Sequence, residues 1–130
     1  MTHIIAINGS PRRQGNTDTV LDAFLRGAEH AGATTSNISL LDIDHKHCLG
    51  CNACHKKGIC IFTDDLTPIF DQVLAADILV LASPIYSMTV TAEMKSFIDR
   101  GQFLWAQKFV TKTLIFSEDH LRRHTGVYLG

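Results

Sequence analysis

Residues 3–17 read HIIAINGSPRRQGNT and indicate the fold more clearly than any other part of the chain. The segment from His3 to Asn8 is a short apolar run that stops at Gly9, which is typical of a strand buried on both faces in a parallel sheet. A polar turn follows, and from Thr17 to Gly32 the apolar residues recur at helical spacing. This strand, turn and helix predict the first unit of an α/β sheet.

The same alternation continues along the chain. Further strands are expected at 34–41, 77–83 and 111–117, and further helices at 66–75 and 92–105. The strand at 34–41 alternates in polarity and is expected near an edge of the sheet. Residues 42–65 have no regular period and predict a long loop, which in a compact domain is usually functional. Residues 118–130 show no clear pattern. The order predicts one α/β domain over residues 1–130, with helices on both faces of a parallel sheet.

Composition excludes several classes of function. The 130 residues are 45% hydrophobic and 19% charged with a formal net charge of -1, so no basic excess points to nucleic acid or an acidic membrane surface. The N-terminal MTHIIAINGS holds too few apolar residues for a signal peptide or a membrane span. We therefore expect a cytoplasmic protein, in which thiols stay reduced and four cysteines indicate metal or redox chemistry rather than disulfides.

The turn after the first strand suits a phosphate monoester. Ser10, Asn16 and Thr17 supply hydroxyl or amide donors, and the following helix presents unpaired N–H groups and the positive end of its dipole. Arg12 or Arg13 could add a charge-assisted hydrogen bond. The segment is neither a Walker A loop nor a GxGxxG fingerprint. A turn in which Asn16 or Thr17 merely caps the helix remains an alternative.

Two segments carry a resemblance to a known family. GSPRRQGNT at 9–17 resembles the FMN phosphate loop of the NAD(P)H-dependent FMN reductases, which are flavodoxin-like. ASPIYSM at 82–88 is similar to their flavin-ring segment, and MKSFIDR at 94–100 is similar to the helix that follows it. The resemblance implies that the phosphate is held by Ser10, Asn16 and Thr17. It implies ring contacts from Pro84, Ile85 and Tyr86, with Arg12 and Met88 as further candidates. Asp99 and Arg100 are interpreted as a solvated helix end.

The four cysteines form the pattern C-x2-C-x2-C-x5-C, at Cys48, Cys51, Cys54 and Cys60. Tight runs of this kind occur around iron–sulfur cubanes, whereas a zinc ion more often takes two separated C-x2-C pairs. Two alternatives stay open: zinc with substitute ligands among His45, His47 and His55, or free thiols. The pattern also resembles that of the iron–sulfur flavoproteins, a branch of the same group. That resemblance implies a [4Fe–4S] cluster in a cysteine-rich loop at about 44–65.

The C-terminal part departs from the family. Relatives have a further glycine-rich loop, a helix and a fifth strand after the fourth strand, but only residues 118–130 remain here. We therefore expect a flavodoxin-like doubly wound sheet that is short of its last helix and strand. An exposed edge at 111–117 beside an aromatic helix predicts a homodimer or larger homo-oligomer, with Trp105 and Ile115 near the contact.

The function expected from these observations is an FMN-dependent oxidoreductase of the iron–sulfur flavoprotein type. It would pass electrons between a reduced donor and an acceptor through FMN and the cluster, with NAD(P)H as a candidate reductant and a small molecule or a protein as redox partner. The cofactors carry this chemistry, so no side chain is named as catalytic. The alternatives are a cluster-free NAD(P)H-dependent FMN or quinone reductase, a flavodoxin-like electron carrier and a zinc-stabilised interaction domain.

Overall fold

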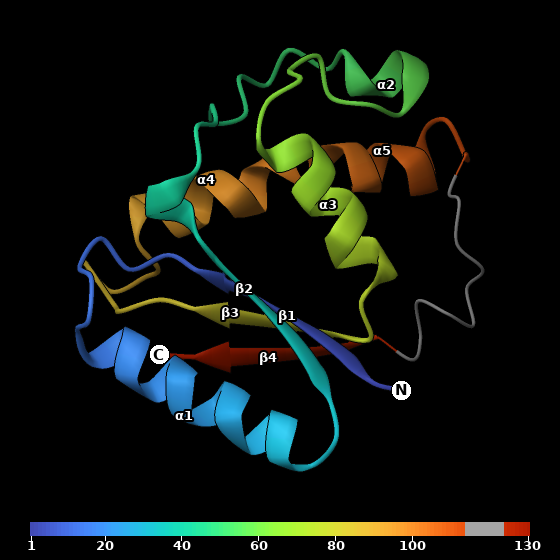
Figure 1. Ribbon diagram of the computed structural model, residues 1–130. Helices are drawn as coiled ribbons and strands as arrows, with labels where there is room; N and C mark the ends of the chain where they lie inside the picture. The colour runs from blue at the N-terminus through green and yellow to red at the C-terminus, as the bar shows by residue number, and fades with distance from the viewer. Residues whose placement is uncertain (114–123) are drawn as a thin grey trace.

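The sheet of this computed structural model, which describes residues 1–113 and 124–130, has four parallel strands (Figure 1). The strands are β1 (His3–Asn8), β2 (Thr34–Ser39), β3 (Ile78–Ala82) and β4 (Thr125–Leu129), in the order β2-β1-β3-β4. In β1, Ile4 pairs with Thr35 of β2 on one side and with Ile78 of β3 on the other. The parallel α/β sheet expected from the sequence is confirmed, and β2 lies at an edge as expected. The strand order is also the one expected of a flavodoxin-like fold.

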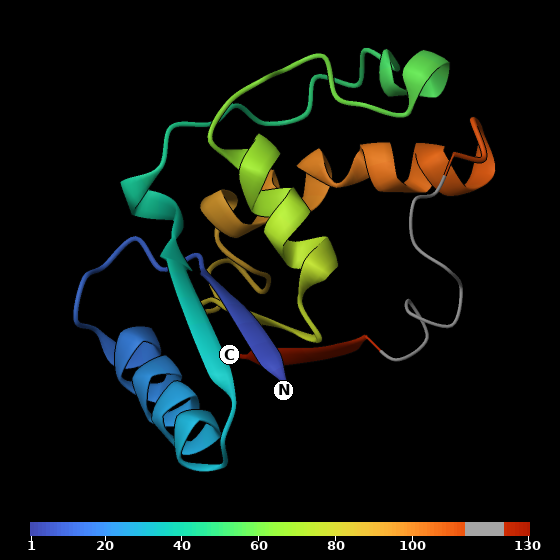
Figure 2. The same ribbon diagram turned by 45° about the vertical axis from the view of Figure 1, so that its right-hand side comes forward.

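Helices cover both faces of the sheet. The longer ones are α1 (Asn16–His30), α3 (Leu66–Ala75), α4 (Ala92–Arg100) and α5 (Gln102–Phe109), and two short ones are η1 (Leu40–Asp42) and α2 (Cys54–Lys57). Figure 1 shows α1 on one face and α3 with α4 on the other. Figure 2 shows that the loop carrying α2 lies beside α5, on the side of the helices away from the sheet. No helix in the described ranges is long and apolar enough to cross a membrane.

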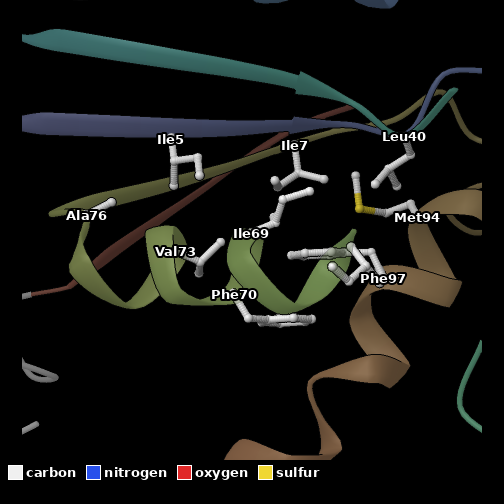
Figure 3. Packing of buried hydrophobic residues seen from close by; sticks show 10 residues of the cluster. Ile5, Ile7, Leu40, Ile69, Phe70, Val73, Ala76, Met94 and Phe97 are labelled. Carbon is white, nitrogen blue, oxygen red and sulfur yellow. The ribbon is translucent and has the colours of Figure 1, made fainter. Parts of the chain in front are cut away.

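Alternate side chains of β1 enter two separate cores, as the period of a strand requires. Ile5 and Ile7 pack with α3 and α4, where Phe70 stacks on Phe97 with ring centroids 4.9 Å apart (Figure 3). Ile4 and Ala6 pack toward α1 on the opposite face, in a core that also contains Leu21. Burial of β1 on both faces explains why its sequence is continuously apolar.

The fourth strand is not where the sequence pattern put it. A strand at 111–117 was expected to pair with β3, and this prediction was wrong. The strand that pairs with β3 is β4, in which Val127 lies opposite Val80. Thr111 and Thr113 instead donate their backbone N–H groups to carbonyls of α5 at 2.9 Å each. The rest of the predicted strand, including Ile115, lies outside the described residues. The outer strand on this side is therefore β4, and the edge argument for assembly no longer applies to 111–117.

The helix expected at 92–105 is two helices. α4 ends at Arg100 and α5 begins at Gln102, with Gly101 between them. The segment 42–65, expected to be loop throughout, also contains the single turn of α2. Apolar residues continue at helical spacing on both sides of Gly101, so their pattern alone predicted one helix and did not reveal the break between α4 and α5.

Candidate functional site

Two loops meet beyond the carboxyl ends of β1 and β3. The first is the β1–α1 turn together with the first two residues of α1, residues 9–17, called the first turn below. The second is the β3–α4 loop at residues 83–91. They enclose a pocket of about 310 Å³, called the turn pocket, whose lining residues are Ser10, Arg12, Gly15, Asn16, Thr17, Pro84 and Tyr86. The structure thus brings together six of the eight residues singled out for a flavin. Ile85 and Met88 belong to the second loop but do not line this pocket.

Neighbouring side chains brace the first turn. The Asn8 amide oxygen accepts from the Ser10 N–H at 2.9 Å, and the Asn8 amide nitrogen donates to Asp18 at 2.6 Å. The other oxygen of Asp18 accepts from the Gln14 N–H at 2.6 Å. Sequence reasoning missed both Asn8 and Asp18, although an Asn two residues before a Ser in a turn is a known local hydrogen-bonding pattern.

The first turn also rests on the start of α4. The Thr91 hydroxyl donates to the Gly9 carbonyl at 2.6 Å and accepts from the Met94 N–H at 3.2 Å as the N-cap of the helix. A Cβ at Gly9 would lie 2.8 Å from the Met94 Cβ, closer than carbon atoms pack. Gly9 therefore lets the first turn approach the start of α4 closely.

The donors of the first turn point to a ligand rather than to a cap. The N-cap of α1 is Gly15, without a side-chain hydrogen bond, so the alternative in which Asn16 or Thr17 caps the helix was wrong. Within the described part of the chain, neither the Asn16 nor the Thr17 side chain has a hydrogen-bond partner. The first N–H groups of α1 likewise have no partner inside the helix. The Ser10 hydroxyl, in contrast, exchanges hydrogen bonds with the backbone of Arg12 at 3.1 and 3.2 Å.

The two arginines of the first turn differ in their surroundings. Arg13 forms an ion pair with Asp42 at 2.6 Å, and this hydrogen bond and charge raise the pKa of Arg13. Arg13 does not line the turn pocket, whereas Arg12 does. Of the two candidates, only Arg12 is therefore placed to meet a ligand in this pocket.

The β3–α4 loop contains a tight turn with an unusual backbone. Tyr86 and Thr89 exchange backbone hydrogen bonds at 2.9 and 3.1 Å, which close a two-residue turn. The two residues inside it, Ser87 and Met88, have φ angles of 48° and 70°. Residues other than glycine rarely adopt this conformation, and when they do they are concentrated at ligand sites. The turn leaves the Met88 side chain 97% exposed.

A second pocket holds all four cysteines. This cysteine pocket of about 30 Å³ lies between the loop at 44–65, called the cysteine loop, and the helices α4 and α5. Its lining residues include Cys48, Cys51, Cys54, Cys60, Phe62, Arg100 and Phe103. Cys54 is buried and Cys51 is exposed. Burial raises the pKa of the Cys54 thiol, and negative charge on Cys60, Cys48 and Cys51 raises it further.

The four thiols line the cysteine pocket, but they are not directed toward a single ligand position. Among residues 1–113 and 124–130, no group of three or more His, Cys, Asp or Glu side chains is arranged to hold a metal ion. The donor set nevertheless suits an iron–sulfur cluster, because four thiolates are its usual ligands and all four face one pocket. His45, His47 and His55 do not line it, so the histidine ligands considered for zinc are not brought to the cysteines. The pocket has the volume of about one water molecule, so the thiols would have to turn and the loop to open for a cluster.

Arg100 is the residue that sequence reasoning misjudged. It was interpreted as part of a solvated helix end, but it is only 3% exposed and lines the cysteine pocket. Its guanidinium donates to the two oxygens of Asp64 at 2.6 and 3.0 Å. These hydrogen bonds lower the pKa of Asp64 below its usual value. Its spacing of three from Phe97, and of six from Met94, could have placed it on the buried face of α4.

Comparisons with known proteins agree with this arrangement. Residues 2–124 match the family described as NADPH-dependent FMN reductase. An iron-sulfur flavoprotein from Archaeoglobus fulgidus is 40% identical over 96 residues, which are 74% of this chain and 44% of that protein. One from Methanocaldococcus jannaschii is 37% identical over 99 residues, 76% of this chain and 51% of that protein. The chain thus spans about half the length of the curated relatives it matches.

A solved structure supports the fold. An NAD(P)H:quinone oxidoreductase from Methanothermobacter marburgensis superposes with a TM-score of 0.66 at 20% identity, over 76% of this chain and 52% of that one. The sequence matches establish the family that the first turn and the cysteine pattern indicated. The chain belongs to the NADPH-dependent FMN reductase family, in the branch whose members are named iron-sulfur flavoproteins.

Proposed function

We propose that this protein is an FMN-dependent oxidoreductase that passes electrons between a reduced donor and an acceptor, with FMN at the turn pocket and a [4Fe–4S] cluster at the cysteine pocket. The observation that carries the proposal is the turn pocket itself. Donors from the start of α1, which have no partner in the part of the chain that the structure describes, line one pocket there with side chains from the β3–α4 loop. Family membership supports the same choice of ligand.

The first turn would hold the phosphate of FMN. Asn16 and Thr17 have side-chain donors that are free of partners among residues 1–113 and 124–130, and the N-terminus of α1 attracts an anion. Arg12 would add a charge-assisted hydrogen bond, and the Ser10 hydroxyl could exchange its bond to Arg12 for one to the ligand. Because Asn8, Asp18 and Thr91 already fix the backbone, little ordering would remain to be done on binding.

The β3–α4 loop would contact the flavin ring. Pro84 and Tyr86 line the turn pocket, and Ile85 and Met88 extend from the same loop with their side chains exposed. Reciprocal hydrogen bonds between Tyr86 and Thr89 hold this loop in one shape. Apolar side chains on a fixed backbone would exclude water from one side of a planar ring.

Cys48, Cys51, Cys54 and Cys60 would ligate the cluster. When bound, FMN would exchange electrons in pairs or singly, and the cluster would exchange them one at a time. The protein's own contribution is to orient the two groups, so we assign no catalytic side chain. We further propose NAD(P)H as reductant, a small molecule or protein as partner and the cytoplasm as location. We also propose a homo-oligomer, for which the exposed aromatic side chains of Trp105 and Phe109 on α5 are the remaining support.

The phosphate site can be tested with FMN and riboflavin, which differ by the phosphate. Flavin-free protein is titrated with each, and quenching of flavin fluorescence gives the two dissociation constants. We expect FMN to bind at least tenfold more tightly, because each charge-assisted hydrogen bond contributes about 1.5–3 kcal/mol. Arg12→Gln should weaken FMN binding and leave riboflavin binding unchanged. Arg13→Gln is the matched control and should change neither. Equal affinity of the wild type for both ligands would contradict the site.

A second candidate function is a cluster-free NAD(P)H-dependent FMN or quinone reductase. The arrangement of the thiols favours this candidate, because within the described residues they do not form a group that could hold a metal ion. NAD(P)H oxidation with a quinone, measured in the four-cysteine variant with serine at each position, separates the two. The second function is favoured if the four-cysteine variant oxidises NAD(P)H as fast as the wild type and the wild-type protein holds no iron.

A further inference from the structure

Arg100 places a buried positive charge at the wall of the cysteine pocket. Its side chain is 2% exposed, and it lies at the C-terminal end of α4. An arginine is rarely buried to this extent unless it is paired. Here the pair is Asp64, 36 residues away in the sequence and at the end of the cysteine loop.

The guanidinium is fixed on several sides. Nη1 donates to the Lys46 carbonyl at 2.7 Å and to Asp64 at 2.6 Å, and Nη2 donates to Asp64 at 3.0 Å. The ring of Phe62 lies 5.4 Å from the guanidinium carbon, within cation–π distance. All three partners belong to the cysteine loop, so Arg100 joins that loop to α4 at a fixed position.

One donor of Arg100 is left unused. Within the described residues, Nε is buried and has no hydrogen-bond partner. A buried donor without a partner is costly and calls for an explanation. Burial lowers the pKa of Arg100, but the hydrogen bonds and charge of Asp64 and the charge of Cys60 raise it overall, so Arg100 is a stable cation. Arg100 and Cys60 line the same pocket.

We infer that Arg100 is a positioning residue whose charge and free Nε–H stabilise the negative charge of the thiolate-ligated group in the cysteine pocket and thereby raise its reduction potential. The inference rests on the cluster of the proposed function and adds a determinant of its potential. One-electron reduction adds one negative charge to the group. A cation held in a poorly solvated wall therefore favours the reduced form more than the oxidised form.

A purely structural role for the ion pair makes a different prediction. If Arg100 only fastens α4 to the cysteine loop, its replacement should lower stability without a systematic effect on the reduction potential.

The charge of Arg100 is partly offset by the charge of its partner, Asp64. The Asp64 carboxylate also accepts from the N–H groups of Lys46 and Leu66 at 3.1 Å each, which spreads its negative charge over further donors.

The test uses anaerobically reconstituted protein with three single variants. Arg100→Gln removes the charge, Arg100→Lys keeps it, and Lys95→Gln removes a positive charge from the exposed face of the same helix. Lys95 pairs with Asp99 and does not line the cysteine pocket, so it is the matched control. Iron and sulfide are measured first, FMN binding reports the fold, and a redox titration then gives the midpoint potential of the cluster.

We expect Arg100→Gln to lower the midpoint potential by at least the equivalent of a tenfold change in the reduction equilibrium, about 59 mV for one electron. Arg100→Lys should shift it less, and Lys95→Gln should leave it unchanged. Cluster loss in Arg100→Gln with retention in Arg100→Lys would also support the inference. An unchanged potential in Arg100→Gln, or equal loss of the cluster in both variants with FMN binding intact, would overturn it. Wild-type protein without iron and sulfide would instead overturn the proposed cluster, and this inference with it.

Discussion

The first turn and the cysteine loop follow neighbouring parallel strands and leave the sheet at the same end, yet they are held in different ways. The first turn is braced mainly by residues close to it in sequence, Asn8 and Asp18, with Thr91 as a distant support. The cysteine loop is held from a distance by α4 and α5, through Arg100 and Gln107. One region is therefore organised locally, and the other depends on long-range contacts.

This difference bears on what each region can bind without rearrangement. The turn pocket, about 310 Å³, is lined by side-chain donors that have no partner within the described residues, on a fixed backbone. The cysteine pocket, about 30 Å³, has its four thiols around a space that must open. We therefore expect ligand binding to change the first turn little and to order the cysteine loop strongly.

The largest effect is expected in the cysteine loop. Serine at any one of Cys48, Cys51, Cys54 or Cys60 should remove most of the iron and sulfide from anaerobically reconstituted protein, because a hydroxyl is a poor replacement for a thiolate ligand. FMN affinity should not change, because the first turn is braced independently. Colorimetric iron and sulfide assays with a parallel flavin titration measure both. A variant that keeps full iron content would show that its cysteine is not a ligand.

In the first turn, the double variant Asn16→Ala with Thr17→Ala should weaken FMN binding by at least tenfold. It removes two side-chain donors to the phosphate, each worth about 1.5–3 kcal/mol when charge-assisted. Thr19→Ala is the control, since its hydroxyl donates to the Gly15 carbonyl and does not line the turn pocket. Fluorescence titration gives the constants. Undiminished affinity in the double variant would mean that the phosphate lies elsewhere.

Two ion pairs allow the regions to be compared in stability. Asp64→Ala should lower the free energy of unfolding by about 2–4 kcal/mol, because it leaves Arg100 buried and uncompensated. Asp42→Ala breaks the exposed pair with Arg13 at the first turn and should change the free energy of unfolding far less, because exposed ion pairs contribute little to stability. Urea denaturation measures both. Equal costs would contradict the view that only the cysteine loop depends on a buried charge.

A smaller effect is expected from the glycines of the cysteine loop. Gly58 has φ +72°, and a Cβ there would lie 2.9–3.0 Å from side-chain atoms of Thr113, Gln107 and Thr111. Gly50 has φ +69° but open space around it. Alanine at either should cost about 1–2 kcal/mol for the backbone, with a further loss at Gly58 from the contacts. Thermal unfolding of both variants shows whether Gly58→Ala is the more destabilising, and the reverse order would disprove the packing argument.

The sequence predicted best where the interactions are local. A buried strand, a polar turn and an amphipathic helix need only short-range patterns, so β1, the first turn and α1 were predicted closely. The spacing of Arg100 from Phe97 could have indicated its burial, but not its ion pair. The partner, Asp64, is 36 residues away, and the residues next to Arg100 give no sign of this pairing. The strand β4 was missed because residues 111–117 also contain the β-branched and aromatic side chains that are typical of a strand, and the prediction chose them over 125–129. Only pairing with β3 distinguishes the two.

The most direct measurement is one absorption spectrum of protein purified without oxygen, combined with its iron and sulfide content. If the two regions hold two redox groups, the spectrum will show flavin bands with a broad absorption at longer wavelength that bleaches on reduction. Iron and sulfide will each approach about four per chain, as a [4Fe–4S] cluster requires. A spectrum without flavin bands would contradict the role of the first turn. Flavin bands alone, or one zinc per chain without sulfide, would contradict the role of the cysteine loop.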